Sequence, residues 1–198
     1  MKKIILDVDP GHDDAVAIML AAFNPEIDLL GITVVAGNQT LEKTFNNALE
    51  VCSQLGIDVP VYKGMPGPMV REQVIADDIH GETGLDGPDF GEITKKGETM
   101  HAVDYIIEKL LGSDEKITLV PTGPLSNIGM ALRKEPRIKE KIEQGSGIAA
   151  PMKTAKYFPP MVIDMIAIGE ESGNIDEMLR EVSKHYDEEV EYAVKALS

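Results

Sequence analysis

Four aspartates lie close together near the start of the chain, in the stretch DVDPGHDDA: Asp7, Asp9, Asp13 and Asp14. Ionised carboxylates that are buried together need a countercharge, because each one left unpaired costs several kcal/mol. Calcium meets this need, since it accepts oxygen ligands from carboxylates, carbonyls and water. The Pro-Gly pair in the middle allows the backbone to turn, so that Asp9 and the Asp13-Asp14 pair converge. A helix cap would need only one of these aspartates, so the stretch predicts a site for a divalent cation.

The segments around these aspartates alternate between short apolar runs and stretches with helical periodicity. Runs rich in Ile and Val predict buried strands at 3–7, 30–36, 59–62 and 117–120. Helical patterns lie between them at 13–23, 41–55 and 99–111, and another begins near residue 124. This alternation predicts an α/β fold, namely half of a doubly wound, Rossmann-like parallel sheet with strand order 3-2-1-4.

In that strand order, the first and fourth strands are neighbours and a crevice opens at their carboxyl ends. The aspartate stretch leaves the first strand there, and PTGPLSN (121–127) leaves the fourth. The two motifs are therefore predicted to meet, although they lie far apart in the sequence. The stretch 65–91 is rich in Gly and Pro and carries IHGETG (79–84). Loops of this length are usually functional or disordered.

The pattern changes after about Pro136, where the alternation of strands and helices ends. QGSGIAAP (144–151) predicts a joint, and the segment 159–168 predicts a helix that ends at a Gly-containing turn. Asn174 is placed to cap a second helix, with Glu177 three residues on as in a capping box. The α/β part is thus expected to be followed by an all-α C-terminal segment.

Composition narrows the class of function. The chain has 198 residues and a net charge of −15, which disfavours binding to nucleic acid or to an anionic membrane surface. No apolar run approaches the roughly 20 residues of a spanning helix, and no signal peptide is evident at the start. The single cysteine, Cys52, is expected to be a core residue and fits a reducing compartment. The expected location is the cytoplasm.

A D-x-D pair after a first strand also occurs in aspartyl-phosphate enzymes of the haloacid-dehalogenase type. Those enzymes carry Thr or Val two positions after the second aspartate, whereas this chain has Gly11 there. Their later lysine and acidic pair are not evident either, so the pattern disfavours this alternative.

Six stretches closely resemble the inosine–uridine-preferring nucleoside hydrolases, and together they run from about Lys2 to about Lys141. The most specific are D-x-D-P-G-x-D-D-A, V-x-G-N-Q and P-T-G-P-L-S-N; the others are VPVYKGMPGPMVR, IHGETGLDGP and HAVDYIIEKL. The resemblance implies hydrolysis of the N-glycosidic bond of ribonucleosides at a calcium ion. That ion would hold a water molecule and the ribose 2′- and 3′-hydroxyls.

For the metal, the resemblance implies Asp9, Asp14 and the carbonyl of Thr122 as ligands. Asp9 also matches the residue that takes the proton of the attacking water, and Asp7 matches a supporting acidic residue. Cleavage of this bond passes through an oxocarbenium-like sugar, which nearby carboxylates stabilise.

For the substrate, the resemblance implies that Asp13 and Asn38 contact the ribose, with Asp13 counted among the catalytic residues. His80 matches a catalytic loop histidine that borders the base. By residue type alone, His80 is equally well explained as a solvated loop residue, and Asn38 as part of a turn.

The second half of that family's pattern is not evident after Ile138: the Met-Gly-Gly turn, the ribose-binding segment and the last metal-binding aspartate. The tail, with FPPMVIDMIAIGEESGNIDEML, instead resembles the cytoplasmic helical domain of the inner-membrane platform protein of type II secretion and type IV pilus systems. We therefore expect a chimera, with a nucleoside-hydrolase-like half-domain at 1–141 and a helical platform-like segment at 142–198.

Two functions stay open at this point. One is calcium-dependent ribonucleoside hydrolysis, expected to be impaired by the missing part of the site. The other is a non-catalytic scaffold or protein-interaction module. A half-sheet would also expose apolar faces, which predicts homo-oligomers.

Overall fold

The computed structural model describes residues 1–75, 81–87, 91–142, 153, 159–172, 180 and 184. The chain divides into two compact units, Met1–Glu143 and Gln144–Ser198. The first unit contains the sheet and all the candidate site residues that lie within the described ranges.

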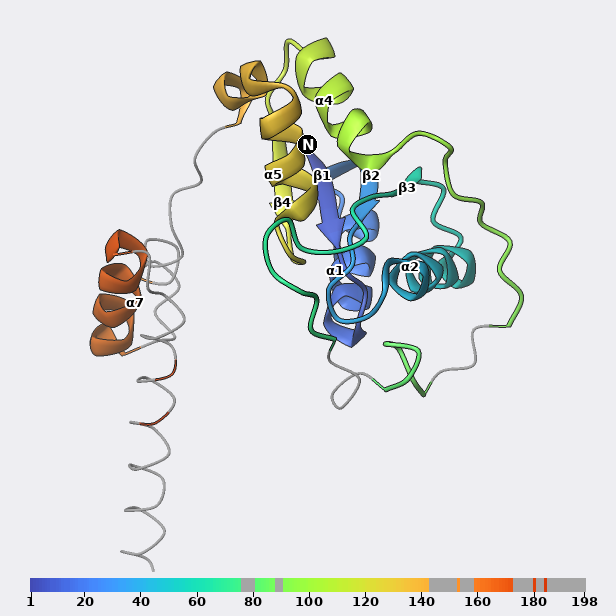
Figure 1. Cartoon of the computed structure of the whole chain (residues 1–198), viewed down its shortest axis with the longest axis horizontal. Coiled ribbons are helices and arrows are strands. Elements are labelled where there is room, and N and C mark those ends of the chain that lie inside the picture. Colours follow the sequence, from blue (N-terminus) through green and yellow to red (C-terminus); the bar gives the residue numbers. More distant parts are fainter. Residues whose placement is uncertain are drawn as a thin grey trace, which may run out of the picture. The chain divides into compact units, whose positions relative to one another are not determined.

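A four-stranded parallel sheet forms the centre of the first unit (Figure 1). Its strands are β1 (Lys2–Val8), β2 (Ile27–Val34), β3 (Val61–Lys63) and β4 (Ile117–Pro121). They pair in the order β3-β2-β1-β4, and each pair is parallel. This confirms the predicted α/β class and strand order. β2 begins earlier than the apolar pattern predicted, because Ile27 already pairs with Lys2 at the start of β1.

Helices cover both faces of the sheet: α1 (His12–Phe23), α2 (Leu41–Leu55), α4 (Ala102–Gly112) and α5 (Ser126–Lys134), the last followed by the 3-10 helix η1 (Pro136–Lys141). The alternating side chains of β1 divide between two apolar clusters. Ile4, Leu6 and Val8 pack with α1 and α2, whereas Ile5 packs with α4, α5 and η1. The sequence pattern did not predict η1.

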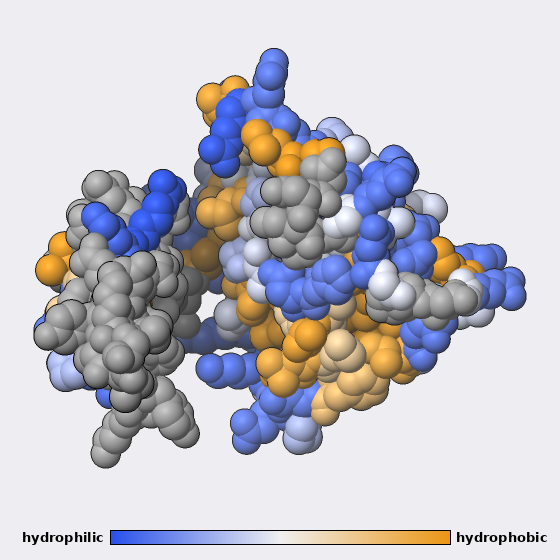
Figure 2. Space-filling model, turned by 90° about the horizontal axis from the view of Figure 1, so that it is seen from below, coloured by the Kyte–Doolittle hydropathy of each residue, from blue (hydrophilic) through white to orange (hydrophobic). Residues whose placement is uncertain are grey.

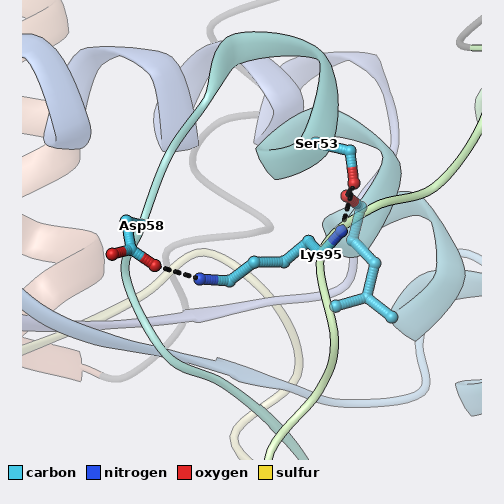
Figure 3. Close-up of polar contacts among 4 residues, drawn as sticks. Ser53, Asp58 and Lys95 are labelled. Atoms are coloured by element: carbon cyan, nitrogen blue, oxygen red, sulfur yellow. Dashed lines mark hydrogen bonds and ion pairs between the residues drawn. The ribbon is translucent and has the colours of Figure 1, made fainter.

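The segment after β3 returns along the C-terminal end of α2 (Figure 3). The Ser53 hydroxyl accepts hydrogen bonds from the backbone N–H groups of Thr94 and Lys95, and the Lys95 Nζ lies 3.2 Å from an Asp58 Oδ1. Cys52, the neighbour of Ser53 in the sequence, is buried, as predicted for a core residue. Burial raises the pKa of its thiol to about 11.

The second unit contains α7 (Pro160–Ser172). The helix predicted at 159–168 is therefore present, but it continues through Gly169 to Ser172, so its predicted end near residue 168 is wrong. A glycine inside a helix lowers its stability but does not end it when the helical bonding continues. The predicted helix capped by Asn174 lies outside the described residues. Within the part of the chain that the structure describes, no helix is long and apolar enough to cross a membrane.

Truncation of a buried β1 side chain should lower the stability of the protein markedly. Ile5 is fully buried at the centre of the α4–α5 cluster, so we expect Ile5→Ala to lower the free energy of unfolding by about 2–5 kcal/mol. Leu20→Ala is the matched control, because Leu20 on α1 is 64% exposed and its truncation should change stability by less than about 0.5 kcal/mol. Urea denaturation of both variants measures the difference, and equal losses would contradict this assignment of the core.

Candidate functional site

Asp9 lies just beyond the carboxyl end of β1 and is 5% exposed. Its Oδ2 accepts a hydrogen bond of 2.7 Å from the backbone N–H of Asn38, and its backbone carbonyl accepts one of 3.1 Å from the Asn38 side chain. Asn38 lies in the turn after β2. Its two hydrogen bonds hold both the main chain and the carboxylate of Asp9 in place. The hydrogen bonds to Asp9 give Asn38 a structural role. Its expected contact with the ribose stays a prediction.

Two glycines enclose the Asp9 carboxylate. A Cβ atom at Gly37 would overlap that carboxylate, and one at Gly123 would lie 2.6 Å from its Oδ1. Gly37 belongs to the turn after β2 and Gly123 to the turn after β4. Any side chain at either position would therefore displace Asp9 or the turn itself.

Asp14 is in the first turn of α1 and is buried. Its Oδ2 accepts a hydrogen bond of 2.8 Å from the backbone N–H of Asp9, and the Thr122 side chain also bonds this carboxylate. A carboxylate in this position benefits from the positive end of the helix dipole. Asp13 is exposed beside it, and its side chain makes no hydrogen bond to the other residues that the structure describes.

Asp7 lies under these residues and is fully buried. Its Oδ1 accepts hydrogen bonds from the Thr33 hydroxyl at 2.6 Å and from the Asn127 amide at 2.7 Å. Among the described residues, its Oδ2 has no hydrogen-bond partner. Asn127 also donates to the Val34 carbonyl and accepts from the Met65 N–H, so it joins α5 to the ends of β1, β2 and β3.

The sequence pattern indicated no separate role for Asn127, although it is the last residue of the PTGPLSN motif. The available signal was an amide directly before the apolar residues of a predicted helix, because a buried amide needs partners on neighbouring elements.

The motifs after β1 and β4 meet, as predicted. The backbone N–H of Thr122 donates to the Asp7 carbonyl at 2.9 Å, and Gly123 lies against Asp9. The remaining predicted residue, His80, lies outside the described residues.

Burial without a countercharge raises the pKa values of the three inner carboxyls. It raises the pKa of Asp9 to about 7 and that of Asp7 to about 6, and it also raises the pKa of Asp14. Neighbouring carboxylates add to the effect at each position. In the part of the chain that the structure describes, no Lys, Arg or His side chain forms an ion pair with them.

A pocket of about 830 Å³ opens beside Asp9 and Asn38. Its walls are the segment 68–75 and the turn from Pro124 to Ser126 at the start of α5. Hydrophobic side chains gather on the face at the carboxyl ends of the strands, which Figure 2 shows. A buried acidic group at the edge of a largely apolar pocket suits a substrate with polar and apolar ends.

The sequence matches the family described as "Inosine-uridine preferring nucleoside hydrolase" over residues 4–178. The chain belongs to this family. Curated relatives include the pyrimidine-specific ribonucleoside hydrolases RihB of Escherichia coli K12 and of Shigella sonnei. Each is 57% identical over 166 residues, which cover 84% of this chain and 53% of the relative. The chain thus spans about half the length of the curated relatives it matches.

Solved structures of the family share the fold. A purine-preferring ribonucleoside hydrolase from Gardnerella vaginalis matches with a TM-score of 0.67 and 38% identity, over 71% of this chain and 46% of that chain. The plant nucleoside hydrolase PpNRh1 matches with a TM-score of 0.65 and 35% identity, over 71% and 45%.

The family match continues well past residue 141, where the sequence resemblance was expected to end. None of these relatives or structures is a secretion-platform protein, so the platform segment and the chimera find no support. The domain division at residue 141 stays a prediction.

The enclosure of Asp9 leads to a first prediction on the site. Gly37→Ala should lower the free energy of unfolding by about 1–3 kcal/mol, because the new methyl group overlaps a buried carboxylate. Gly112→Ala is the control, since a Cβ there meets no atom of the described residues within 4 Å. Thermal unfolding compares the two. A Gly37→Ala variant as stable as the control would show that the carboxylate is not held between the two turns.

The burial of Asp7 leads to a second prediction. Its folded-state pKa of about 6 lies above the ordinary value of 3.8, so the folded state binds a proton more tightly than the unfolded state. The contribution of Asp7 to stability is therefore lost as the pH rises from about 4 to about 6. Asp7→Asn should remove this loss, and its stability relative to wild type should rise by about 2–3 kcal/mol over that range.

Urea denaturation at a series of pH values, in EDTA, measures this change. Asp114→Asn is the control, because Asp114 is exposed and its variant should follow the wild-type pH dependence. A constant difference between Asp7→Asn and wild type across this range would overturn the prediction.

Proposed function

We propose that this protein hydrolyses the N-glycosidic bond of ribonucleosides with the help of a bound calcium ion. One observation carries the proposal most directly: Asp9, which lines the pocket, and Asp14, whose carboxylate bonds the Asp9 N–H, are both buried, and no cationic side chain among the described residues forms an ion pair with them. Membership of the nucleoside hydrolase family supports the reaction type.

The atoms that the site offers are of the type that a hard divalent cation prefers. Asp9, Asp14 and the carbonyl of Thr122 would supply oxygen ligands only, which calcium prefers. Within the described ranges, no third His, Cys, Asp or Glu joins the two aspartates in a metal-holding group. When bound, calcium would orient and acidify a water molecule and hold the ribose hydroxyls.

Asp9 is the proposed base. Burial raises its pKa to about 7 in the absence of a cation, and a bound calcium ion would favour its ionised form, which can accept a proton from water. The hydrogen bonds from Asn38 aim its Oδ2 and leave the other oxygen beside Gly123. Asp14 would add negative charge near the oxocarbenium-like sugar, and Asp7 would support the floor of the site.

The substrate is proposed to be a ribonucleoside, with its ribose near Asp13 and Asn38 and its base in the pocket beside segment 68–75. His80 is the proposed residue bordering the base. Pyrimidine ribonucleosides are the first choice, because the relatives at 57% identity carry a pyrimidine-specific name.

A second candidate is a protein that binds calcium or ribose without turnover. It is favoured by the two-carboxylate donor set of the described residues. Both candidates use the same aspartates, so only a measurement of turnover separates them.

Hydrolysis of uridine and of p-nitrophenyl riboside by the purified chain tests the proposal. Turnover in calcium should fall at least about 100-fold in EDTA and in Asp9→Asn, which keeps the shape of the side chain but cannot accept the proton. Asp114→Asn should keep wild-type turnover, as an exposed aspartate far from the pocket. Wild-type turnover no greater than that of Asp9→Asn would refute the enzymatic proposal and leave the binding protein.

A further inference from the structure

The segment 68–75 forms one wall of the pocket beside Asp9. Several of its side chains are apolar and exposed, among them Val70 and Val74 at 98% and 85%. Within the described residues, no backbone group of this segment hydrogen-bonds to another backbone group. The position of the wall must therefore depend on side-chain contacts.

Gln73 makes the polar contact that the wall needs. Its Nε2 donates to the carbonyl of Gln39 at 2.9 Å and lies 3.5 Å from the carbonyl of Gly37. Among the described residues, these are the hydrogen bonds that join segment 68–75 to the rest of the protein. Gln73 is half-buried, so its amide is partly shielded from competing water.

The acceptor of this contact belongs to the turn that orients Asp9. The Gln39 carbonyl also accepts from the N–H of Gly37, and Asn38 between them bonds the Asp9 carboxylate. Gln73 thus fastens the wall to the same three residues, Gly37 to Gln39, that fix the candidate base. The bonds between Asn38 and Asp9 do not themselves involve Gln73.

The other end of the wall rests on α5. A Cβ at Gly129 would lie 3.0 Å from the Met69 sulfur, so Met69 packs closely on the helix at that point. The wall is consequently held at two places, by van der Waals contact at Met69 and by hydrogen bonds at Gln73.

We propose that Gln73 is a positioning residue that holds segment 68–75 against the Gly37–Gln39 turn and so builds the apolar wall for the base of the substrate. This inference rests on the proposed function for the identity of the substrate. Because Asn38 keeps its bonds to Asp9 without Gln73, loss of the Gln73 amide should weaken substrate binding and spare the chemical step.

Limited trypsin digestion tests the position of the wall without any need for activity. Arg71 is exposed two residues before Gln73, and cleavage there reports local opening of the segment. Gln73→Met keeps the length of the side chain and removes the donor, so cleavage after Arg71 should accelerate on the order of tenfold. Gln73→Glu should accelerate it at least as much, since a carboxylate repels two carbonyls.

Gln54→Met on α2 is the matched control, because it makes the same substitution at an exposed helical position. Its cleavage after Arg71 should equal that of wild type. Equal cleavage in Gln73→Met, Gln54→Met and wild type would overturn the inference, whether or not the chain hydrolyses nucleosides.

Kinetics supply the second readout. For uridine, Gln73→Met should raise KM by on the order of tenfold and change kcat by less than about threefold. A fall in kcat at unchanged KM would overturn the positioning role. If wild type has no turnover, the proposed function fails separately, and calorimetric binding of uridine by wild type and Gln73→Met then replaces KM.

Discussion

The site is organised around buried negative charge that the protein itself does not neutralise. Asp7, Asp9 and Asp14 lie at the carboxyl edge of the sheet, where burial disfavours their ionised forms. Backbone N–H groups, hydroxyls and amides from several elements share the task of holding them. Such an arrangement lowers stability in the absence of a cation, which is a common property of functional sites. The surrounding turns are best understood as the support for that arrangement.

The parallel sheet makes this support possible. Its order places β1 beside β4, so the turns that follow both strands open into one crevice. β2 contributes the turn that carries Asn38, and α5 contributes Asn127 from the opposite face. Segments that follow β1, β2 and β4, which are distant from one another in the sequence, therefore meet around Asp7, Asp9 and Asp14. The apolar clusters on the two faces keep these segments in register.

Much of the fold could be predicted because its signals are local. Short Ile- and Val-rich runs marked the strands, and helical periodicity marked α1, α2 and α4 within a few residues. The meeting of the motifs after β1 and β4 followed from strand order alone. The 3-10 helix η1 has no comparable pattern, and the continuation of α7 through Gly169 depends on bonding that composition does not reveal.

The site was predictable in its residue types and less so in its contacts. The aspartate cluster indicated a cation, but the roles of Asn127 and Gln73 depend on neighbours more than 30 residues away. The interpretation of the tail relied on resemblance over a short motif, which the family match through residue 178 does not support.

The enclosure of Asp9 between Gly37 and Gly123 has a consequence for any attempt to redesign this corner of the protein. The two glycines are 86 positions apart, and each approaches more than the carboxylate. A Cβ at Gly37 would also lie 2.7 Å from the Pro124 ring, and a Cβ at Gly123 would lie 3.0 Å from the Asp9 backbone nitrogen. Truncation of the aspartate would therefore not free either position for a side chain, because the turns after β2 and β4 approach their neighbours closely with or without the carboxylate.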